Sequence, residues 1–379
     1  MKIKQRKIAF IQYTDPAAYP PVINASTILA EQGWSVSFWG VRGEGDSTQM
    51  CMPLHAAMSL HLLPYVPPGW RQKLHYFTFA IHCVFRALLW RPDVVYVSDS
   101  WAYPIEWFIS WIPGVRTIAH EHDTPPESGG MVIRVFRFFR RQLFRRSLLT
   151  VIPQEERARK VKESTLAKDV RVVFNCPRIS EIKPIQQARR LGTVTLWYHG
   201  SIVPSQFPIS VIHALKLLPS HVQLRFAGYE TIGSKGYVQT LPVEAKKCGV
   251  DARVNYAGTM PTRQQLFDEA AQCDIGLALF ARQFREPMVG ASNKPFDYLA
   301  CGLAILVNDT EEWRGFFSLC QSARYCNPES ARDIAESIND LIRDEQRFHR
   351  ERLQGQSLIQ QLWNYDNQFA QIATVVNKD

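Results

Sequence analysis

The fold is decided by Gly290-Ala-Ser-Asn-Lys-Pro-Phe-Asp-Tyr-Leu-Ala-Cys-Gly302, a polar loop that runs into a short helical pattern. Pro295 suits the first turn of a helix, where a missing N–H group costs little. Apolar runs at residues 275–280 and 304–308 flank this stretch and indicate buried strands. A strand, a helix and a second strand in this order predict one βα unit of a parallel sheet.

The same alternation of short apolar runs and longer helical patterns extends over most of the chain. Other helical patterns cover residues 208–218 and 263–272, and the chain beyond Ser330 has a helical pattern to its end. The expected strands are residues 7–13, 35–39, 93–98, 115–120, 148–152 and 170–174 in the first half, and 194–199, 222–227, 253–257, 275–280 and 304–308 in the second. This pattern predicts two doubly wound α/β domains with parallel sheets.

The length of 379 residues also favours two domains, because one hydrophobic core seldom supports a chain of this size. A polar stretch with little periodicity, residues 181–192, separates the two patterns and indicates a linker. We therefore predict an N-terminal domain over residues 1–180, this linker, a C-terminal domain over 193–356 and a closing helix over 357–379. The closing helix can cross back to the first domain.

The formal net charge of +9 favours acidic partners such as sugar nucleotides, anionic lipid surfaces or nucleic acids. No recognised nucleic-acid-binding motif accompanies the charge, so we expect no nucleic-acid partner. The eight cysteines include no CxxC pair, which argues against a zinc site and favours reduced, buried thiols.

The N-terminus passes from a short basic stretch into the first apolar run without the hydrophobic region of a signal peptide, so we expect a cytoplasmic protein. The most apolar long stretch, residues 74–90, contains His75, His82 and Arg86 and is shorter than the ~20 apolar residues that span a bilayer. No transmembrane helix is therefore predicted.

Chemistry is expected in the loops that follow the strands, because ligands of open α/β sheets bind beyond the carboxyl ends of the strands. In the loop before Pro295, free N–H groups at the helix start can bind phosphate, and Lys294 adds a positive charge. Asp297 lies in the first helical turn, where its carboxylate can accept hydrogen bonds from two ribose hydroxyls. Alternatively, Asp297 only stabilises the helix N-terminus, an effect of ~0.3–1 kcal/mol.

The run from Ser292 to Gly302 resembles the donor-site block of retaining GT-B glycosyltransferases of the family 4 type, in which a Glu usually occupies the place of Asp297. Other blocks match in the same order: Trp197-Tyr-His-Gly-Ser-Ile202, Leu224-Arg-Phe-Ala-Gly228, and Val254-Asn-Tyr-Ala-Gly-Thr259 followed by Cys273-Asp-Ile-Gly-Leu277. The resemblance implies a GT-B fold of two Rossmann-like domains facing a central cleft. It also implies a nucleotide diphosphate sugar as donor substrate, with no metal or other cofactor.

The resemblance further implies which residues bind the donor. Gly200 and Ser201 approach the diphosphate, and Gly258, Thr259 and Met260 line the base pocket with main-chain groups. The loop before the helix, with Ser292, Asn293 and Lys294, holds the diphosphate, and the carboxylate of Asp297 holds the ribose. Gly228 is interpreted as a turn glycine only.

The sequence departs from the family pattern at the sugar-binding end of the site. Family members commonly carry a Glu eight residues before the ribose-binding carboxylate, where this chain has Val289. The nearest acid is Glu286, which either contacts the sugar from a reshaped loop or leaves that contact missing. The basic residues that often follow the first strand of the C-terminal domain are absent from residues 201–207, and Lys294 can compensate for them.

A second candidate loop is Thr117-Ile-Ala-His-Glu-His-Asp-Thr-Pro-Pro-Glu127, which follows a strand of the first domain. Two histidines and three carboxylates at the end of a strand indicate a site. In the family that this chain resembles, a His or a His–acid pair at this place faces the donor sugar. Either His122 with Asp123 or His120 with Glu121 can be the equivalent pair, with His122 favoured, and a metal site is the competing interpretation.

Residues 131–149 form a basic amphipathic pattern, with Arg134, Arg137, Arg141 and Arg145 on one helical face. Val132, Val135, Phe136, Phe139 and Leu143 are expected on the opposite side. Such a helix can rest on an anionic membrane, where each cation contributes ~1 kcal/mol. The alternative is a helix packed on the first sheet with its arginines in solvent.

These observations predict a hexosyltransferase that moves a sugar from a nucleotide diphosphate sugar to a hydroxyl of a carbohydrate or lipid-linked acceptor, with retention at the anomeric carbon. Bacterial cell-surface polysaccharide or glycolipid synthesis, peripheral to the inner face of the plasma membrane, would suit the basic helix. Two alternatives stay open. A sugar-nucleotide epimerase can share the architecture, and an inactive partner subunit would account for the missing Glu and phosphate clamp.

Overall fold

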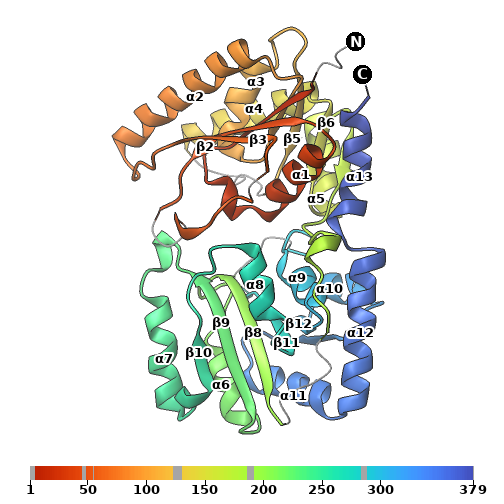
Figure 1. The fold of residues 1–379 in the computed structure, drawn as a ribbon. Helices are drawn as coiled ribbons and strands as arrows, with labels where there is room; N and C mark the ends of the chain where they lie inside the picture. The colour runs from red at the N-terminus through yellow and green to blue at the C-terminus, as the bar shows by residue number, and fades with distance from the viewer. Residues whose placement is uncertain are drawn as a thin grey trace. The chain divides into compact units, whose positions relative to one another are not determined.

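The computed structural model describes residues 5–44, 48–53, 55–122, 130–185, 192–282 and 288–378. The chain forms two compact units, and Figure 1 shows a sheet with helices packed on it in each. The first unit comprises Met1–Asn175 together with Tyr365–Asp379. The second unit comprises Cys176–Asn364.

The first unit contains a parallel sheet with the strand order β3-β2-β1-β4-β5-β6-β7. Its strands are β1 (Lys7–Ile11), β2 (Ser35–Val41), β3 (Met58–Leu63), β4 (Val94–Val97), β5 (Arg116–His120), β6 (Leu149–Ile152) and β7 (Val170–Val172). Successive strand side chains point to opposite faces. Ile8 and Phe10 therefore pack into one core, while Ala9 and Ile11 pack into another.

Two helical layers cover these two faces. The core with Ile8 and Phe10 is closed by α1 (Pro20–Glu31) and α13 (Tyr365–Val376), so the last helix of the chain belongs to the first unit. The other core is closed by α2 (Trp70–Trp90), α3 (Tyr103–Ile109), α4 (Met131–Arg146) and α5 (Glu155–Thr165). Among the described residues, no helix is both long enough and apolar enough to cross a bilayer.

The second unit contains a parallel sheet with the strand order β10-β9-β8-β11-β12-β13. Its strands are β8 (Val194–Ser201), β9 (Val222–Tyr229), β10 (Val254–Tyr256), β11 (Ile275–Ala278), β12 (Ala304–Asn308) and β13 (Ala323–Cys326). One face is covered by α6 (Ser210–Leu217), α7 (Tyr237–Cys248) and α11 (Ala331–Ile342). The remaining helices are α8 (Arg263–Ala270), α9 (Lys294–Ala300), α10 (Glu311–Phe316) and α12 (Glu345–Gln361).

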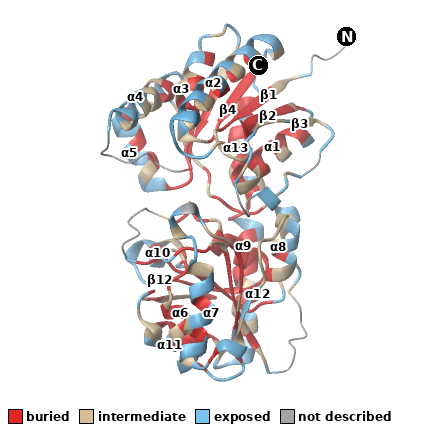
Figure 2. Cartoon of the chain, turned by 90° about the vertical axis from the view of Figure 1, so that its left-hand side faces the viewer, coloured by how far each residue is buried: buried red, intermediate tan, exposed pale blue. Residues whose placement is uncertain are grey.

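Helix α9 packs closely against the other face of this sheet. All seven of its residues are buried, as Figure 2 shows. A Cβ added to Gly276 on β11 would lie 2.2 Å from the ring of Tyr298. Only a glycine at this strand position leaves room for the tyrosine, and the contact fixes α9 against β11.

The two parallel α/β sheets confirm the predicted fold class, and each predicted strand is present with small shifts of its ends. The prediction of one closing helix over residues 357–379 is wrong, because α12 ends at Gln361 and α13 begins at Tyr365. Asn364 Nδ2 donates to the last carbonyl oxygens of α12 and ends that helix. Two strands were not predicted, β3 and β13, and each forms one edge of its sheet. Residues 181–185 of the predicted linker are held within the second unit, where Glu181 pairs with Arg263 and Lys183 with Asp268. Residues 186–191 lie outside the described part of the chain.

Candidate active site

Three glycines meet at the carboxyl edge of the second sheet. Gly200 at the end of β8 pairs with Gly228 at the end of β9, and the Gly228 N–H donates to the carbonyl oxygen of Gly258 (2.9 Å). A Cβ on Gly228 would lie 1.8 Å from the carbonyl oxygen of Gly200. Gly228 is therefore required for close packing of two strand ends, beyond the turn role expected from the sequence.

The loop after β10 is fastened to the same edge. The Thr259 hydroxyl donates to the carbonyl oxygen of Gly228 (3.1 Å), and the Tyr256 hydroxyl donates to the same oxygen (2.7 Å). Gly258 has a φ of +79°, a left-handed conformation that favours glycine. The half-buried segment from Gly258 to Met260, predicted to line the base pocket, thus begins beside Gly228, with β9 between it and the end of β8.

Lys294, the first residue of α9, reaches the end of β8. Its Nζ donates to Gln206 Oε1 (2.9 Å) and lies over the rings of Tyr198 and Phe280 at 5.6 and 5.7 Å. A Cβ on Gly200 would be 3.4 Å from this Nζ. Burial lowers the pKa of Lys294 to about 8, and the negative charge of Asp297 acts in the opposite direction. The structure therefore brings Lys294 and Gly200 together, and their contact with a diphosphate stays a prediction.

Asp297 is fully buried and already has partners within the chain. Arg263 donates to its Oδ1 (3.1 Å), and Asn293 Nδ2 donates to its Oδ2 (2.6 Å). Burial alone would raise the pKa of the Asp297 carboxyl, but Arg263 and His199 outweigh burial and lower it. Asp297 is therefore an ionised carboxylate at the centre of a buried network, and its predicted ribose contact stays a prediction.

Two members of this network, Arg263 and His199, were not predicted as site residues. Arg263, the first residue of α8, also donates to Glu181 (2.7 Å). Trp197 Nε1 donates to His199 Nδ1 (3.0 Å), so the proton of the neutral imidazole is assigned to Nε2. This Nε2 lies 3.3 Å from Asp297 Oδ2, in an orientation too poor for a good hydrogen bond.

Ser292 lies two residues before Lys294 and is nearly completely buried. Its N–H donates to the carbonyl oxygen of Met288 (2.8 Å), but its hydroxyl has no hydrogen-bond partner among the described residues. A buried hydroxyl normally finds a partner, so an unpaired one indicates a place for a ligand or water. Glu286, the other acid predicted near the sugar, lies outside the described residues.

The histidines of the first unit lie at the end of β5. Tyr96 and His120 share a hydrogen bond between the hydroxyl and Nδ1 (2.7 Å), and the rings of His120 and His122 are 4.0 Å apart. Burial, with a smaller effect of Arg157, lowers the pKa of His122 to about 3. His120 Nε2 and both ring nitrogens of His122 lack partners in the described part of the chain. Burial also lowers the pKa of His120, so both imidazoles are neutral with unused hydrogen-bonding capacity among the described residues.

Glu121 points away from these histidines because side chains alternate along β5. Its carboxylate binds Arg140 through two contacts and accepts a hydrogen bond from the Tyr103 hydroxyl (3.1 Å). The structure thus separates Glu121 from the His120 side of the strand and engages it in packing between β5 and α4. Asp123, the acid of the alternative pair, lies outside the described residues.

The described residues include one group with metal-ligand spacing, formed by His213, Glu244 and Cys248 on α6 and α7. This group contains neither histidine of the β5 loop. The metal interpretation of that loop therefore gains no support from the described geometry.

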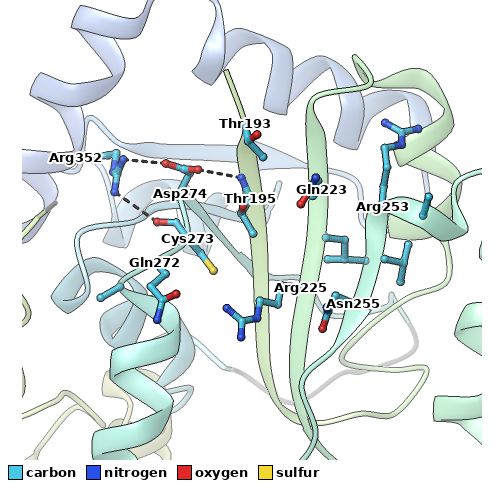
Figure 3. A pocket seen from close by; sticks show the side chains of 14 residues that line it. Thr193, Thr195, Gln223, Arg225, Arg253, Asn255, Gln272, Cys273, Asp274 and Arg352 are labelled. Atoms are coloured by element: carbon cyan, nitrogen blue, oxygen red, sulfur yellow. Dashed lines mark hydrogen bonds and ion pairs between the residues drawn. The ribbon is translucent and has the colours of Figure 1, made fainter. Parts of the chain in front are cut away.

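One cavity, of about 720 Å³, lies away from this edge of the second sheet. Figure 3 shows it lined by Thr195, Gln223 and Arg225, near the amino ends of β8 and β9. Two of its arginines pair with acids: Arg352 donates to Asp274 (3.1 Å), and Arg225 pairs with Glu269. Ligands of open α/β sheets bind at the opposite edge, so the site is assigned to the carboxyl ends.

Comparisons with known proteins agree with this geometry. Residues 25–178 match the family model described as a glycosyl transferase 4-like domain, and residues 210–374 match one described as glycosyl transferase-like. Together these matches span most of the chain. The chain therefore belongs to the glycosyltransferases of GT-B type.

Solved structures match over nearly the whole chain. HepE from Anabaena, crystallised with UDP and glucose, is 16% identical with a TM-score of 0.74, over 99% of this chain and 100% of HepE. Sucrose-phosphate synthase from Thermosynechococcus elongatus is 13% identical with a TM-score of 0.74, over 98% of each chain. WaaG, a glycosyltransferase of lipopolysaccharide biosynthesis, is 14% identical with a TM-score of 0.72, over 98% of this chain and 100% of WaaG. A search of curated proteins returned no match.

Proposed function

We propose that the chain transfers a hexosyl unit from a nucleotide diphosphate sugar to an acceptor hydroxyl, with retention at the anomeric carbon. The observation that carries the proposal is the approach of Lys294 to Gly200 at the carboxyl edge of the second sheet. The leaving diphosphate gains negative charge as the glycosidic bond breaks. A cation fixed by packing stabilises this charge without reorganisation.

The positions of the described carboxylates favour a mechanism without a protein nucleophile. Asp297 and Glu121 are both buried and bound to arginines, which leaves neither placed to form a glycosyl–enzyme bond. In the proposed step, the bond from the anomeric carbon to the diphosphate oxygen breaks, and a bond to the acceptor oxygen forms on the same face. The acceptor proton passes to the departing diphosphate oxygen, so no protein base is required and no metal is part of the proposal.

The first unit would bind the acceptor or the transferred sugar through neutral imidazoles. His120 and His122 can each donate or accept a hydrogen bond with a sugar hydroxyl, and their lowered pKa values keep them uncharged at neutral pH. HepE was crystallised with UDP and glucose, and WaaG acts in lipopolysaccharide biosynthesis. These likenesses support uridine diphosphate sugars as the first donors to test, with a cell-surface carbohydrate or glycolipid as acceptor.

The test is incubation with a panel of nucleotide diphosphate sugars, with and without candidate acceptors. Release of nucleoside diphosphate that depends on the acceptor, and a product whose NMR coupling shows the donor's anomeric configuration, would support the proposal. An inverted product would contradict retention. Conversion of the nucleotide sugar to its epimer without acceptor would favour the epimerase, and absence of calorimetric binding to every nucleoside diphosphate would favour an inactive partner subunit.

A further inference from the structure

Helix α2 in the first unit is apolar on both sides. Its inner side chains Phe79, Cys83 and Ala87 are completely buried against the sheet. The opposite side carries a stripe at helical spacing, with each side chain between 51% and 64% exposed: Leu74, Phe77, Ile81, Phe85 and Leu88. A surface helix normally presents polar residues on that side. The outer side of α2 is therefore built for contact with something apolar.

The exposed apolar surface continues onto the neighbouring helices of the same layer. A groove of about 460 Å³ runs between α2 and α3 and includes Phe77, Phe85 and Phe108. Phe136 of α4 packs on Tyr76 of α2, which joins α4 to this surface. Figure 1 shows α2, α3 and α4 in the first unit. Val132 and Val135 of α4, expected from the sequence on the side opposite the arginines, are exposed. We call the α2 stripe with these exposed residues of α3 and α4 the apolar face.

The apolar face is bordered by positively charged side chains, and the helices that carry them have no acidic residues. The segments of α2 and α4 contain no Asp or Glu, and α4 alone carries six arginines. Arg134, Arg137 and Arg141 border a hollow of about 380 Å³ beside Ser164 of α5. The guanidinium of Arg146 lies 3.8 Å from the ring centre of Trp111. By contrast, α5 in the same layer mixes acids and bases, as an ordinary solvated helix does.

We propose that the apolar face docks on an anionic lipid bilayer, with α2 lying in the plane of the interface. Its stripe would enter the acyl boundary while the arginines of α4 contact lipid phosphates. Charge distinguishes this occupant from a second copy of the chain, because a twofold contact would bring the same arginine border against itself. The proposal rests on surface chemistry and is independent of the transfer reaction.

The apolar part of the proposal is tested by flotation of the full chain with vesicles of phosphatidylcholine alone or with phosphatidylglycerol, without any nucleotide sugar. Phe77→Ser with Phe85→Ser should reduce partitioning to the anionic vesicles by about 100-fold or more, because each buried phenylalanine contributes about tenfold or more. The matched control is Leu319→Ser with Leu353→Ser, which changes two exposed leucines of the second unit and should leave partitioning unchanged. Thermal unfolding of each variant verifies that it folds.

The charge part is tested with Arg134→Gln and Arg141→Gln, which should together lower binding to anionic vesicles by about 30-fold, or about fivefold for each arginine. The control is Arg332→Gln with Arg343→Gln, two exposed arginines of the second unit. Absence of wild-type flotation would overturn the proposal, as would equal binding by wild type and both test variants. A dimer in lipid-free solution that dissociates on Phe77→Ser with Phe85→Ser would assign the face to a second copy instead.

Discussion

The two strand-end clusters differ in how their polar groups are satisfied. In the second unit, Lys294 and Asp297 are buried charges with partners from the same chain. In the first unit, His120 and His122 are neutral, and three of their four ring nitrogens have no partner among the described residues. The difference indicates that the second unit holds a preorganised charged site, whereas the imidazoles of the first unit keep hydrogen-bonding capacity for a partner beyond the described residues.

The largest expected effect comes from breaking the charged network. Asp297→Ala leaves Arg263 buried with only Glu181 as its remaining acid partner, and removal of one member of a buried ion pair typically costs about 3–5 kcal/mol. We expect that loss in the free energy of unfolding, measured by urea denaturation. Asp297→Asn, which keeps the shape but not the charge, is the control and should lose less. Stability equal to wild type in Asp297→Ala would refute the idea that the network holds the site together.

The contribution of the Asp297 carboxylate to folding stability should decrease as the pH falls. The folded pKa of Asp297 is below its ordinary value, so the folded state binds fewer protons than the unfolded chain in acid. Its contribution to stability is complete above the ordinary pKa of about 3.9 and is lost as the pH falls through the lower folded value.

Lys294 provides a test of whether preorganisation serves the donor. Lys294→Met should weaken binding of a nucleoside diphosphate by about 1.5–3 kcal/mol, the range for hydrogen bonds to charged groups. In the folded chain without ligand, the pKa of Lys294 is about 8, so the side chain loses its charge above that pH. The affinity of the wild-type chain for a nucleoside diphosphate should therefore also fall as the pH rises above 8. Calorimetric titration between pH 7 and pH 9 measures both effects, with exposed Lys246→Met as control. If Lys294→Met leaves the affinity unchanged, Lys294 does not bind the diphosphate.

The sequence predicts that Lys294 lies near Gly200, but it does not predict the ion pair between Asp297 and Arg263. Both Gly200 and the loop before α9 follow strands of one parallel sheet, so their proximity follows from strand order. Arg263 lies 34 residues before Asp297 on another helix, and only the packed structure joins them. The position of Glu121 could have been predicted, because period-two alternation directs it away from His120 and His122.

The unpredicted strands have a similar physical explanation. β3 and β13 are edge strands with partly exposed residues, so neither shows the continuous apolar run of a central parallel strand. Asp123 and Glu286 lie outside the described residues, so their predicted contacts with the donor sugar stay predictions.

A substitution of His122 tests whether the strand-end cluster of the first unit is neutral. The pKa of His122 is about 3 in the folded chain and about 6.5 when unfolded, so protons favour the unfolded state below pH 6.5. Between pH 7 and pH 5, wild-type stability should fall by about 1–2 kcal/mol more than that of His122→Gln, from 1.36 kcal/mol for each pH unit. Urea denaturation at both pH values measures this difference. His221→Gln, at an exposed position, should retain the wild-type pH dependence; if His122→Gln retains it too, His122 is not buried as a neutral imidazole.

The smallest expected effect concerns Ser292, the exception within the second unit. Its buried hydroxyl has no partner among the described residues, so Ser292→Ala removes no described hydrogen bond and should change the free energy of unfolding by less than about 0.5 kcal/mol. If the hydroxyl is reserved for the donor, the same substitution should weaken nucleoside diphosphate binding by about 0.5–1.5 kcal/mol, measured by calorimetry. Ser292→Cys keeps the volume with a weaker donor and should fall between alanine and wild type. A loss of stability without a loss of affinity would mean that Ser292 is satisfied within the chain, and the second unit would then be complete without its substrate.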